Sequence, residues 1–271
     1  MDQKRVLILT QEMKPYLIAS EMAEIANRLP QYIQENGYEI RVLMPRFGNI
    51  NERRHRLHEV VRLSGMNIIV DEDDYPLIIK VASLPGARMQ VYFLDNEDFF
   101  KRKSVFRDKD EKFHKDNAER MIFFCKGALE TVKRMDWPPD IIHCNGWMTS
   151  LVPLYLKTAY QNEAVFKKSK IIYSVYKNSF EETFNKQFLK KAPISDAISE
   201  EQLDVFKGLN NSSLNQGGVH FSDGVIVGSE DLDVEATEMI QNSGKPVLDF
   251  TNGEDYLNAY HEFYESLSEK S

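Results

Sequence analysis

Short apolar runs alternate with longer stretches in which apolar residues recur every three or four positions. Residues 5–10 contain the continuous apolar run 6–9, which predicts a buried strand. In residues 20–36 the apolar side chains fall on one helical face, which predicts a helix. Residues 39–44, with Ile40 and the apolar residues 42–44, predict a second strand that ends at Pro45. This order predicts two parallel strands joined by a crossover helix.

The ends of the first predicted helix carry recognisable residues. Ser20 is the predicted N-cap, because a serine hydroxyl can accept a hydrogen bond from the first turn. Gly37 suits the position just after the helix, where the backbone often turns left-handed. Pro30 lies inside the pattern and removes one backbone hydrogen bond, so we expect the helix to be kinked or split there.

In the middle of the chain, short apolar runs without helical stretches between them interrupt the alternation of predicted strands and helices. Apolar runs at 66–70, 77–83 and 89–94 are joined by short turns and predict an antiparallel or mixed insert. The later pattern predicts helices at 115–134, 148–159 and 254–267, and strands at 140–144, 170–175, 223–227 and 246–250.

Residues 178–218 are rich in Lys, Asn and Ser and predict an irregular excursion with a helix near 200–207. The alternation elsewhere predicts an α/β fold, doubly wound and Rossmann-like, with a mostly parallel sheet. The strand at 6–10 is expected at its centre, between those at 40–44 and 141–144.

Composition narrows the class of protein. The chain has 271 residues, with 34 Lys and Arg against 42 Asp and Glu, a net charge of −8. That balance argues against nucleic acid or an anionic membrane as partner. The apolar run near the N-terminus is too short for a signal peptide or a membrane span. Cys125 and Cys144 cannot form a disulfide framework, so we expect a cytoplasmic protein.

Common chemical motifs are absent. Neither G-x-G-x-x-G nor G-x-x-x-x-G-K-[ST] occurs, so both phosphate-loop fingerprints are missing. His55 and His58 lack partners at ligand spacing, and we predict no metal site and no cofactor. The acidic run at 71–74 is interpreted as a solvated turn. Gly217 and Gly218 are interpreted as a tight turn rather than an anion-binding loop.

A series of short motifs follows one order along the chain. They read TQEM at 10–13, NGYEIRVLMPRFG at 36–48, VYFLD at 91–95, DNAER at 116–120, PDIIHC at 139–144 and QGG at 216–218. In this order they resemble the N-terminal half of bacterial glycogen synthases and plant starch synthases, over residues 1–230. The resemblance implies one half of a GT-B glycosyltransferase. Such enzymes transfer glucose from a sugar nucleotide to an α-1,4-glucan with retention of configuration.

The sequence departs from that family at the mouth of the first helix. The family carries Lys-Thr-Gly-Gly-Leu-Ala-Asp, and residues 18–24 read Ile-Ala-Ser-Glu-Met-Ala-Glu. In the family the lysine contacts the sugar nucleotide, and its place is taken by Ile18. The second glycine is replaced by Glu21, whose carboxylate would repel a diphosphate.

Two further family motifs are altered. The family's His-x-His-Asp-Trp becomes His-Cys-Asn-Gly-Trp at 143–147, so Asn145 replaces the histidine beside the transferred sugar. The family's Thr-x-His-Asn becomes Ser-Val-Tyr-Lys at 174–177. We therefore predict no intact catalytic residue, with Asn145 as the degenerate position.

The ligand-binding candidates are the residues that keep the family's identity or occupy its altered positions. They are Glu12, Ser20, Asp116, Asn117, Arg120, Asn145, Trp147, Tyr176 and Lys177. A scaffold role at strand ends and helix starts is the alternative for those that match the family. With Thr10, Gln11 and Gly146, several of them should line a crevice outside the carboxyl ends of the strands, open on one side.

Residues 231–271 predict only a terminal strand and helix, so we interpret 1–271 as a single domain without the second GT-B domain. Three functions stay open. The chain is a binding or regulatory pseudo-enzyme for a sugar nucleotide, an α-glucan or a protein; or a glucosyltransferase half completed by another chain; or an unrelated α/β protein. A homo-oligomer or a synthase-like partner chain is expected, with self-association through 256–263 or 178–218.

Overall fold

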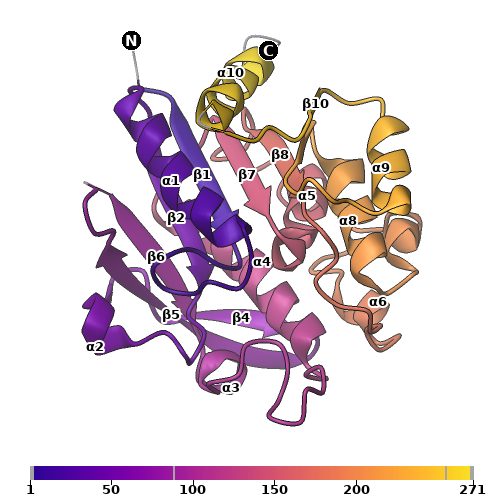
Figure 1. Ribbon diagram of the computed structural model, residues 1–271. Coiled ribbons are helices and arrows are strands. Elements are labelled where there is room, and N and C mark those ends of the chain that lie inside the picture. Colours follow the sequence, from indigo (N-terminus) through magenta and orange to yellow (C-terminus); the bar gives the residue numbers. More distant parts are fainter. Residues whose placement is uncertain (1–2, 88, 254, 269–271) are drawn as a thin grey trace.

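The computed structural model describes residues 3–87, 89–253 and 255–268 (Figure 1). Its strands form one mixed sheet in the order β10-β9-β8-β7-β1-β2-β6-β5-β3, with β4 paired to β5 beside this path. In chain order they are β1 (Arg5–Thr10), β2 (Glu39–Pro45), β3 (His58–Glu59), β4 (Met66–Val70), β5 (Asp73–Ser83), β6 (Gln90–Asp95), β7 (Ile141–Asn145), β8 (Lys170–Val175), β9 (Gly224–Val227) and β10 (Val247–Leu248).

The central strands are parallel, from β10 through β1 to β6. Among the named strands of the described residues, the pairs made by β5, with β3, β4 and β6, are the antiparallel ones. This arrangement confirms the predicted α/β class with a mostly parallel sheet. It also confirms β1 at the centre, between β2 and β7.

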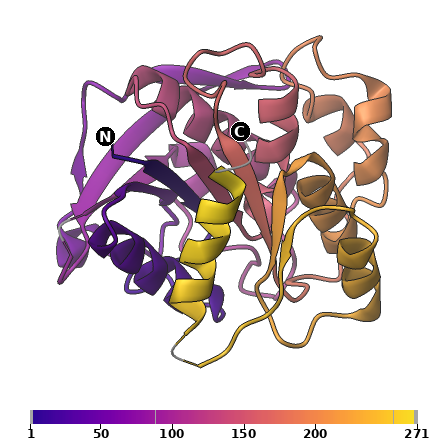
Figure 2. The ribbon, with the colours of Figure 1, turned by 90° about the horizontal axis from the view of Figure 1, so that it is seen from above.

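Helices cover both faces of the sheet. They are α1 (Met22–Glu35), α2 (Glu52–His55), α3 (Glu97–Phe100), α4 (Asn117–Arg134), α5 (Leu151–Lys157), α6 (Phe188–Lys191), α7 (Glu200–Leu203), α8 (Asn211–Phe221), α9 (Val234–Gln241) and α10 (Tyr256–Ser268), with short 3₁₀ helices η1 (Trp147–Thr149) and η2 (Asp204–Phe206). Figure 2 shows α1 and α10 side by side on one face, with α4 and α5 on the other.

Alternating side chains of β8 contact the two helical layers. The Tyr173 hydroxyl donates to Asn215 on α8 at 3.0 Å. The next residue, Ser174, points to the other face, where its Oγ lies 2.6 Å from His143 Nε2. His143 Nδ1 lies 2.6 Å from the Tyr264 hydroxyl on α10. Because successive strand residues face opposite ways, β7 and β8 link both layers.

The start of α1 differs from the prediction. The assigned N-cap is Glu21, one residue after the predicted Ser20, and Glu21 makes no side-chain cap bond. The Ser20 hydroxyl nevertheless accepts from Met22 N at 3.2 Å, as predicted for a cap, and it donates to the Glu12 carboxylate. The helix runs through Pro30 as one element, and the predicted split does not occur. Burial of Pro30 and its apolar neighbours compensates for the lost hydrogen bond. Gly37 follows with φ 93°, as expected.

The predicted turn at Gly217 and Gly218 is wrong, because both residues lie inside α8. A Cβ atom on Gly217 would come within 2.0 Å of the Phe206 ring, and one on Gly218 within 2.5 Å of the Tyr173 ring. The two glycines thus allow α8 to pack closely on η2 and β8. Their N–H groups belong to a helix interior and do not form an anion-binding loop.

Other predicted boundaries shift. The acidic run is a turn only at its start, since Asp71 has φ 60° and Asp73 already begins β5. The irregular excursion contains α6, α7, η2 and most of α8. Residues 231–271 hold α9 in addition to the predicted strand and helix. Within the described residues, no helix is long and apolar enough to cross a membrane.

The apolar face of α10 is buried inside the chain. Leu257, Tyr260, Phe263 and Tyr264 are all less than a tenth exposed. Gly224 of β9 leaves room for this face, since a Cβ there would lie 2.7 Å from a Leu267 methyl group. The apolar side chains of residues 256–263 thus pack inside the chain, and self-association through this segment stays a prediction.

Candidate functional site

Parallel strands bring the predicted site residues to one edge of the sheet. Thr10 at the end of β1 pairs with Asn145 at the end of β7, and Asn145 pairs with Ser174 of β8. The segments that leave these strands carry Glu12 and Tyr176. We call this side, where the parallel strands end, the carboxyl edge.

Glu12 occupies the hydrogen-bond donors of the loop before α1. Its carboxylate accepts from Ala19 N at 2.6 Å, from Ser20 N at 2.9 Å and from Ser20 Oγ at 2.5 Å. Glu12 is only 2% exposed. Backbone N–H groups before a helix are the donors that bind phosphate in many proteins. Here these donors already bind a carboxylate of the chain itself.

A second carboxylate lies beside the first. Glu21 at the N-cap of α1 accepts a hydrogen bond from the Ser229 hydroxyl, which follows β9. Ile18, at the place of the family's lysine, is 64% exposed. The loop before α1 therefore presents carboxylates and an exposed apolar side chain, and Ile18 offers no positive charge.

Asn145 makes its hydrogen bonds inside the protein. Its Oδ1 accepts from the Tyr176 hydroxyl at 3.0 Å, and its Nδ2 donates to the Leu9 carbonyl at 3.4 Å. Burial raises the pKa of Tyr176, and the charges of Glu12 and Glu21 raise it further. The phenol therefore stays neutral and holds the Asn145 amide in place.

Asn117 and Arg120, at the start of α4, hold the segment after α3. Arg120 donates from Nε to the Phe99 carbonyl at 2.9 Å and from Nη1 to Asn117 Oδ1 at 2.7 Å. Nη1 also donates to the Val105 carbonyl. The Asn117 amide donates to the Phe106 carbonyl at 2.9 Å. Through these hydrogen bonds, Asn117 and Arg120 hold residues 99–106 against the start of α4.

The surroundings of Arg120 are apolar. Its guanidinium lies 5.3 Å from the ring centroids of both Phe47 and Phe100. Burial lowers the pKa of Arg120, and the nearby Arg102 lowers it further, whereas Asp116 raises it. Asp116 in turn forms an ion pair with Arg102. The described structure thus gives both charged candidates partners within the chain.

Trp147 belongs to an aromatic cluster that the sequence did not indicate. Its ring centroid lies 5.0 Å from that of Phe106 and 5.1 Å from that of Phe180. Phe113 stacks on Phe180 at 4.8 Å. A hollow of about 260 Å³ opens over these four rings and Arg107. The indole Nε1 of Trp147 is buried and has no hydrogen-bond partner among the described residues.

The structure brings the predicted crevice residues together but buries most of them. The buried ones are Thr10, Gln11, Glu12, Asn145, Gly146, Trp147 and Tyr176. Lys177 alone of the predicted crevice residues is exposed, and its backbone N–H donates to Ser229 Oγ at 3.0 Å. No group of three or more His, Cys, Asp or Glu in the described ranges could hold a metal ion. The hollows that open at this edge include the aromatic hollow and one of about 420 Å³ beside Lys177, Asn178 and Asp233.

Fold and site together define one half of a GT-B-like protein. A profile of the starch synthase catalytic domain matches residues 5–245, and the chain belongs to this family.

Two glycogen synthases illustrate the relationship. The chain is 39% identical over 205 residues to that of Chlorobaculum parvum, covering 74% of this chain and 42% of the relative. It is 42% identical over 173 residues to that of Chlorobaculum tepidum, covering 64% and 36%. The chain thus spans about two fifths of the length of the curated relatives it matches.

A solved structure shows the same fold. The catalytic domain of starch synthase IV from Arabidopsis thaliana, bound to ADP and acarbose, superposes with a TM-score of 0.74 at 19% identity. The superposition covers 94% of this chain and 52% of that one.

Proposed function

We propose that this chain is a pseudo-enzyme of the glycogen and starch synthase family, with a binding or regulatory role. On this proposal it binds a neutral α-glucan at the carboxyl edge and transfers no glucose alone. The observation that carries the proposal is the Glu12 carboxylate, which takes the three donors of the loop before α1.

Charge disfavours a sugar nucleotide at this edge. A diphosphate entering beside α1 would face Glu12 and Glu21, with Ile18 in place of a lysine. A carboxylate about 5 Å from a phosphate, in surroundings with an effective dielectric constant of about 20, repels it by about 3 kcal/mol. The burial of Glu12 makes its charge poorly screened.

A neutral glucan meets no such repulsion. Phe106 and Phe113 are partly exposed at the hollow and offer flat apolar faces for the C–H groups of a sugar ring. Beside them the Arg107 guanidinium pairs with the Glu182 carboxylate, and both can hydrogen-bond sugar hydroxyls. Starch synthase IV was solved with acarbose, and we extend carbohydrate binding to this chain by family membership.

One observation favours a second function. The matched region makes up 42% of the Chlorobaculum parvum glycogen synthase. On this second proposal, a synthase-like partner chain completes the enzyme, and the assembled pair is a glucosyltransferase. Under either function we expect the protein to work in the cytoplasm, where a second copy or a partner chain could cover the carboxyl edge.

Glucan binding is tested by titrating maltoheptaose into the chain by isothermal calorimetry. We expect Phe113→Ala to weaken binding at least about fivefold, because it removes a ring that lines the hollow. Phe221→Ala is the matched control, since Phe221 is equally half-buried and lies on α8 outside the hollow. Absence of binding by the wild-type chain, or equal binding by Phe113→Ala, would contradict the proposal.

A further inference from the structure

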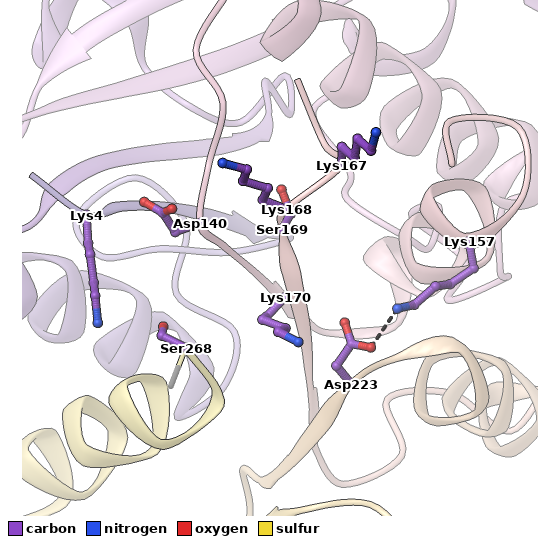
Figure 3. A pocket seen from close by; sticks show the side chains of 9 residues that line it. All are labelled: Lys4, Asp140, Lys157, Lys167, Lys168, Ser169, Lys170, Asp223 and Ser268. Carbon is purple, nitrogen blue, oxygen red and sulfur yellow. Dashed lines mark hydrogen bonds and ion pairs between the residues drawn. The ribbon is translucent and has the colours of Figure 1, made fainter. Parts of the chain in front are cut away.

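A second hollow lies at the opposite side of the sheet, where the parallel strands begin. We call this side the amino edge. The hollow has a volume of about 630 Å³ and is lined by Lys4, Asp140, Lys157, Lys167, Lys168, Ser169, Lys170, Asp223 and Ser268 (Figure 3). These residues come from the starts of four neighbouring strands, the end of α5 and the end of α10. The lining holds five lysines against two aspartates, in a chain whose net charge is −8.

Both aspartates already have partners in the backbone. Asp140 Oδ2 accepts from Arg5 N at 2.8 Å, at the start of β1. Asp223 Oδ2 accepts from Ile171 N at 2.8 Å, and its Oδ1 pairs with Lys157 at 2.6 Å. These carboxylates fix the strand starts, and the pair with Lys157 is the one ion pair drawn in Figure 3.

The remaining lysines have no such partner. Lys4, Lys167, Lys168 and Lys170 form no ion pair with any described residue. Like charges gathered around a concave surface repel one another, and a bound anion would relieve that repulsion.

The backbone that carries three of these lysines is firmly held. Ser169 N donates to the Phe166 carbonyl at 2.9 Å, and Ser169 Oγ donates to the Pro139 carbonyl at 2.6 Å. The Phe166 ring is buried and packs edge-on against Tyr160 at 5.9 Å. Lys167 and Lys168 are therefore presented from an ordered turn and Lys170 from the first position of β8, which reduces the entropy lost when they bind a ligand.

We infer that the amino-edge hollow is a binding site for a small soluble molecule that carries two linked phosphate groups. The lysine excess of three positive charges matches the two to three negative charges of a diphosphate at neutral pH. The volume lies in the range of small-molecule pockets. The site is separate from the carboxyl edge and goes beyond the proposed function.

The test uses inorganic pyrophosphate as probe and calorimetric titration of the whole chain. We expect binding of one pyrophosphate per chain that weakens as salt is raised. The double variant Lys168→Ala with Lys170→Ala should weaken it at least about thirtyfold, since each lost charge-assisted hydrogen bond costs about tenfold. The side chain of Lys168 is exposed and that of Lys170 is half-exposed, so folding should survive, as a thermal melt would verify.

The matched control is Lys186→Ala with Lys190→Ala, which removes two exposed lysines outside the hollow and should leave binding unchanged. No binding by the wild-type chain, or equal binding by the Lys168 and Lys170 variant, overturns the inference. Co-sedimentation with phosphatidylglycerol vesicles without pyrophosphate binding also overturns it, since the lysines would then contact a lipid surface. Maltoheptaose binding should be the same in both double variants, which separates this test from that of the proposed function.

Discussion

The carboxyl edge and the amino edge of one sheet differ in how their charges are arranged. At the carboxyl edge, Glu12 and Asn145 are buried and hydrogen-bonded to their neighbours. At the amino edge, exposed and half-exposed lysines surround an open hollow, and most have no ion-pair partner among the described residues. A single strand, β8, runs from Lys170 at one edge to Val175 at the other.

The difference between the two edges distinguishes the contribution of the fold to ligand binding from that of individual side chains. Ligands of open α/β sheets usually bind beyond the carboxyl ends of the strands, and this chain keeps that geometry. The donors there are nevertheless occupied by Glu12, whereas positive charge gathers at the other edge. The fold therefore sets where ligands can approach, and the local side chains decide which charge is accepted.

The largest effect on stability should come from replacing Arg120, whose buried side chain holds the segment after α3. Arg120→Met removes the donor to the Phe99 and Val105 carbonyls and leaves the buried Phe99 carbonyl and Asn117 Oδ1 without this partner. We expect the free energy of unfolding to fall by about 3 kcal/mol, measured by urea denaturation. Lys115→Met, at an exposed position just before α4, should change it by less than about 0.5 kcal/mol. Equal stability of the two variants would show that the guanidinium is not a support.

Acid should lower the stability of the protein through His143 of β7, which lies in the sheet between the two edges. Burial lowers the pKa of His143 from 6.5 to about 3. Between these values the unfolded chain binds a proton that the folded chain does not, so stability falls as pH falls. We expect a loss of about 2 kcal/mol between pH 6.5 and pH 5 from this group.

The check is the pH dependence of urea unfolding in wild type and His143→Asn, which should have the shallower slope. Imidazole NMR signals of folded wild type give an independent measurement if the variant is unstable. A His143 signal that titrates near pH 6 would refute the assignment of a neutral buried ring.

Two substitutions at the carboxyl edge should reduce the difference in charge between the two edges. Ile18→Lys combined with Glu21→Gly restores the residues that the family carries at the mouth of α1. We expect affinity for ADP-glucose, measured by calorimetry, to rise by about tenfold, because a repulsive carboxylate is replaced and a cation is added. Ile69→Lys is the control, since Ile69 is also an exposed isoleucine but lies on β4. Unchanged affinity in the double variant would mean that charge at this mouth does not limit nucleotide binding.

The smallest effect on stability should come from removing the hydrogen bond between Tyr176 and Asn145 at the carboxyl edge. Tyr176→Phe deletes the hydroxyl that donates to Asn145 Oδ1 at 3.0 Å. Loss of one buried hydrogen bond should cost about 1 kcal/mol in unfolding free energy. Tyr32→Phe removes an exposed hydroxyl contact and should cost less than about 0.5 kcal/mol. Similar values for both variants would argue against a firm Asn145–Tyr176 contact.

The sheet was largely predictable because buried parallel strands contain apolar runs, as at residues 6–9 of β1 and 42–44 of β2. The helix α9 escaped prediction because its first residue, Val234, is 73% exposed and its apolar pattern is weak. Asp233 is nevertheless a residue type preferred at N-caps. In the structure it caps α9, since its side chain accepts from Ala236 N at 2.8 Å. Gly217 and Gly218 suggested a turn because their tight packing depends on rings distant in sequence.

The candidate site was predictable only in part. Parallel register explains why residues after β1, β7 and β8 meet, and family motifs located them. The partners of Glu12 depend on the path of the loop before α1, which no local pattern specifies. The aromatic hollow combines Phe113, Trp147 and Phe180 from three distant segments, so periodicity could not reveal it.

The central claim of the proposed function is that this chain alone transfers no glucose. Its direct test is incorporation of labelled glucose from ADP-glucose or UDP-glucose into glycogen by the purified chain. Each lost transition-state contact costs about 10²–10³ in rate, so we predict no incorporation above a protein-free blank, and none after Asn145→His alone. Sustained turnover by the wild-type chain, after removal of any co-purifying synthase, would contradict the account.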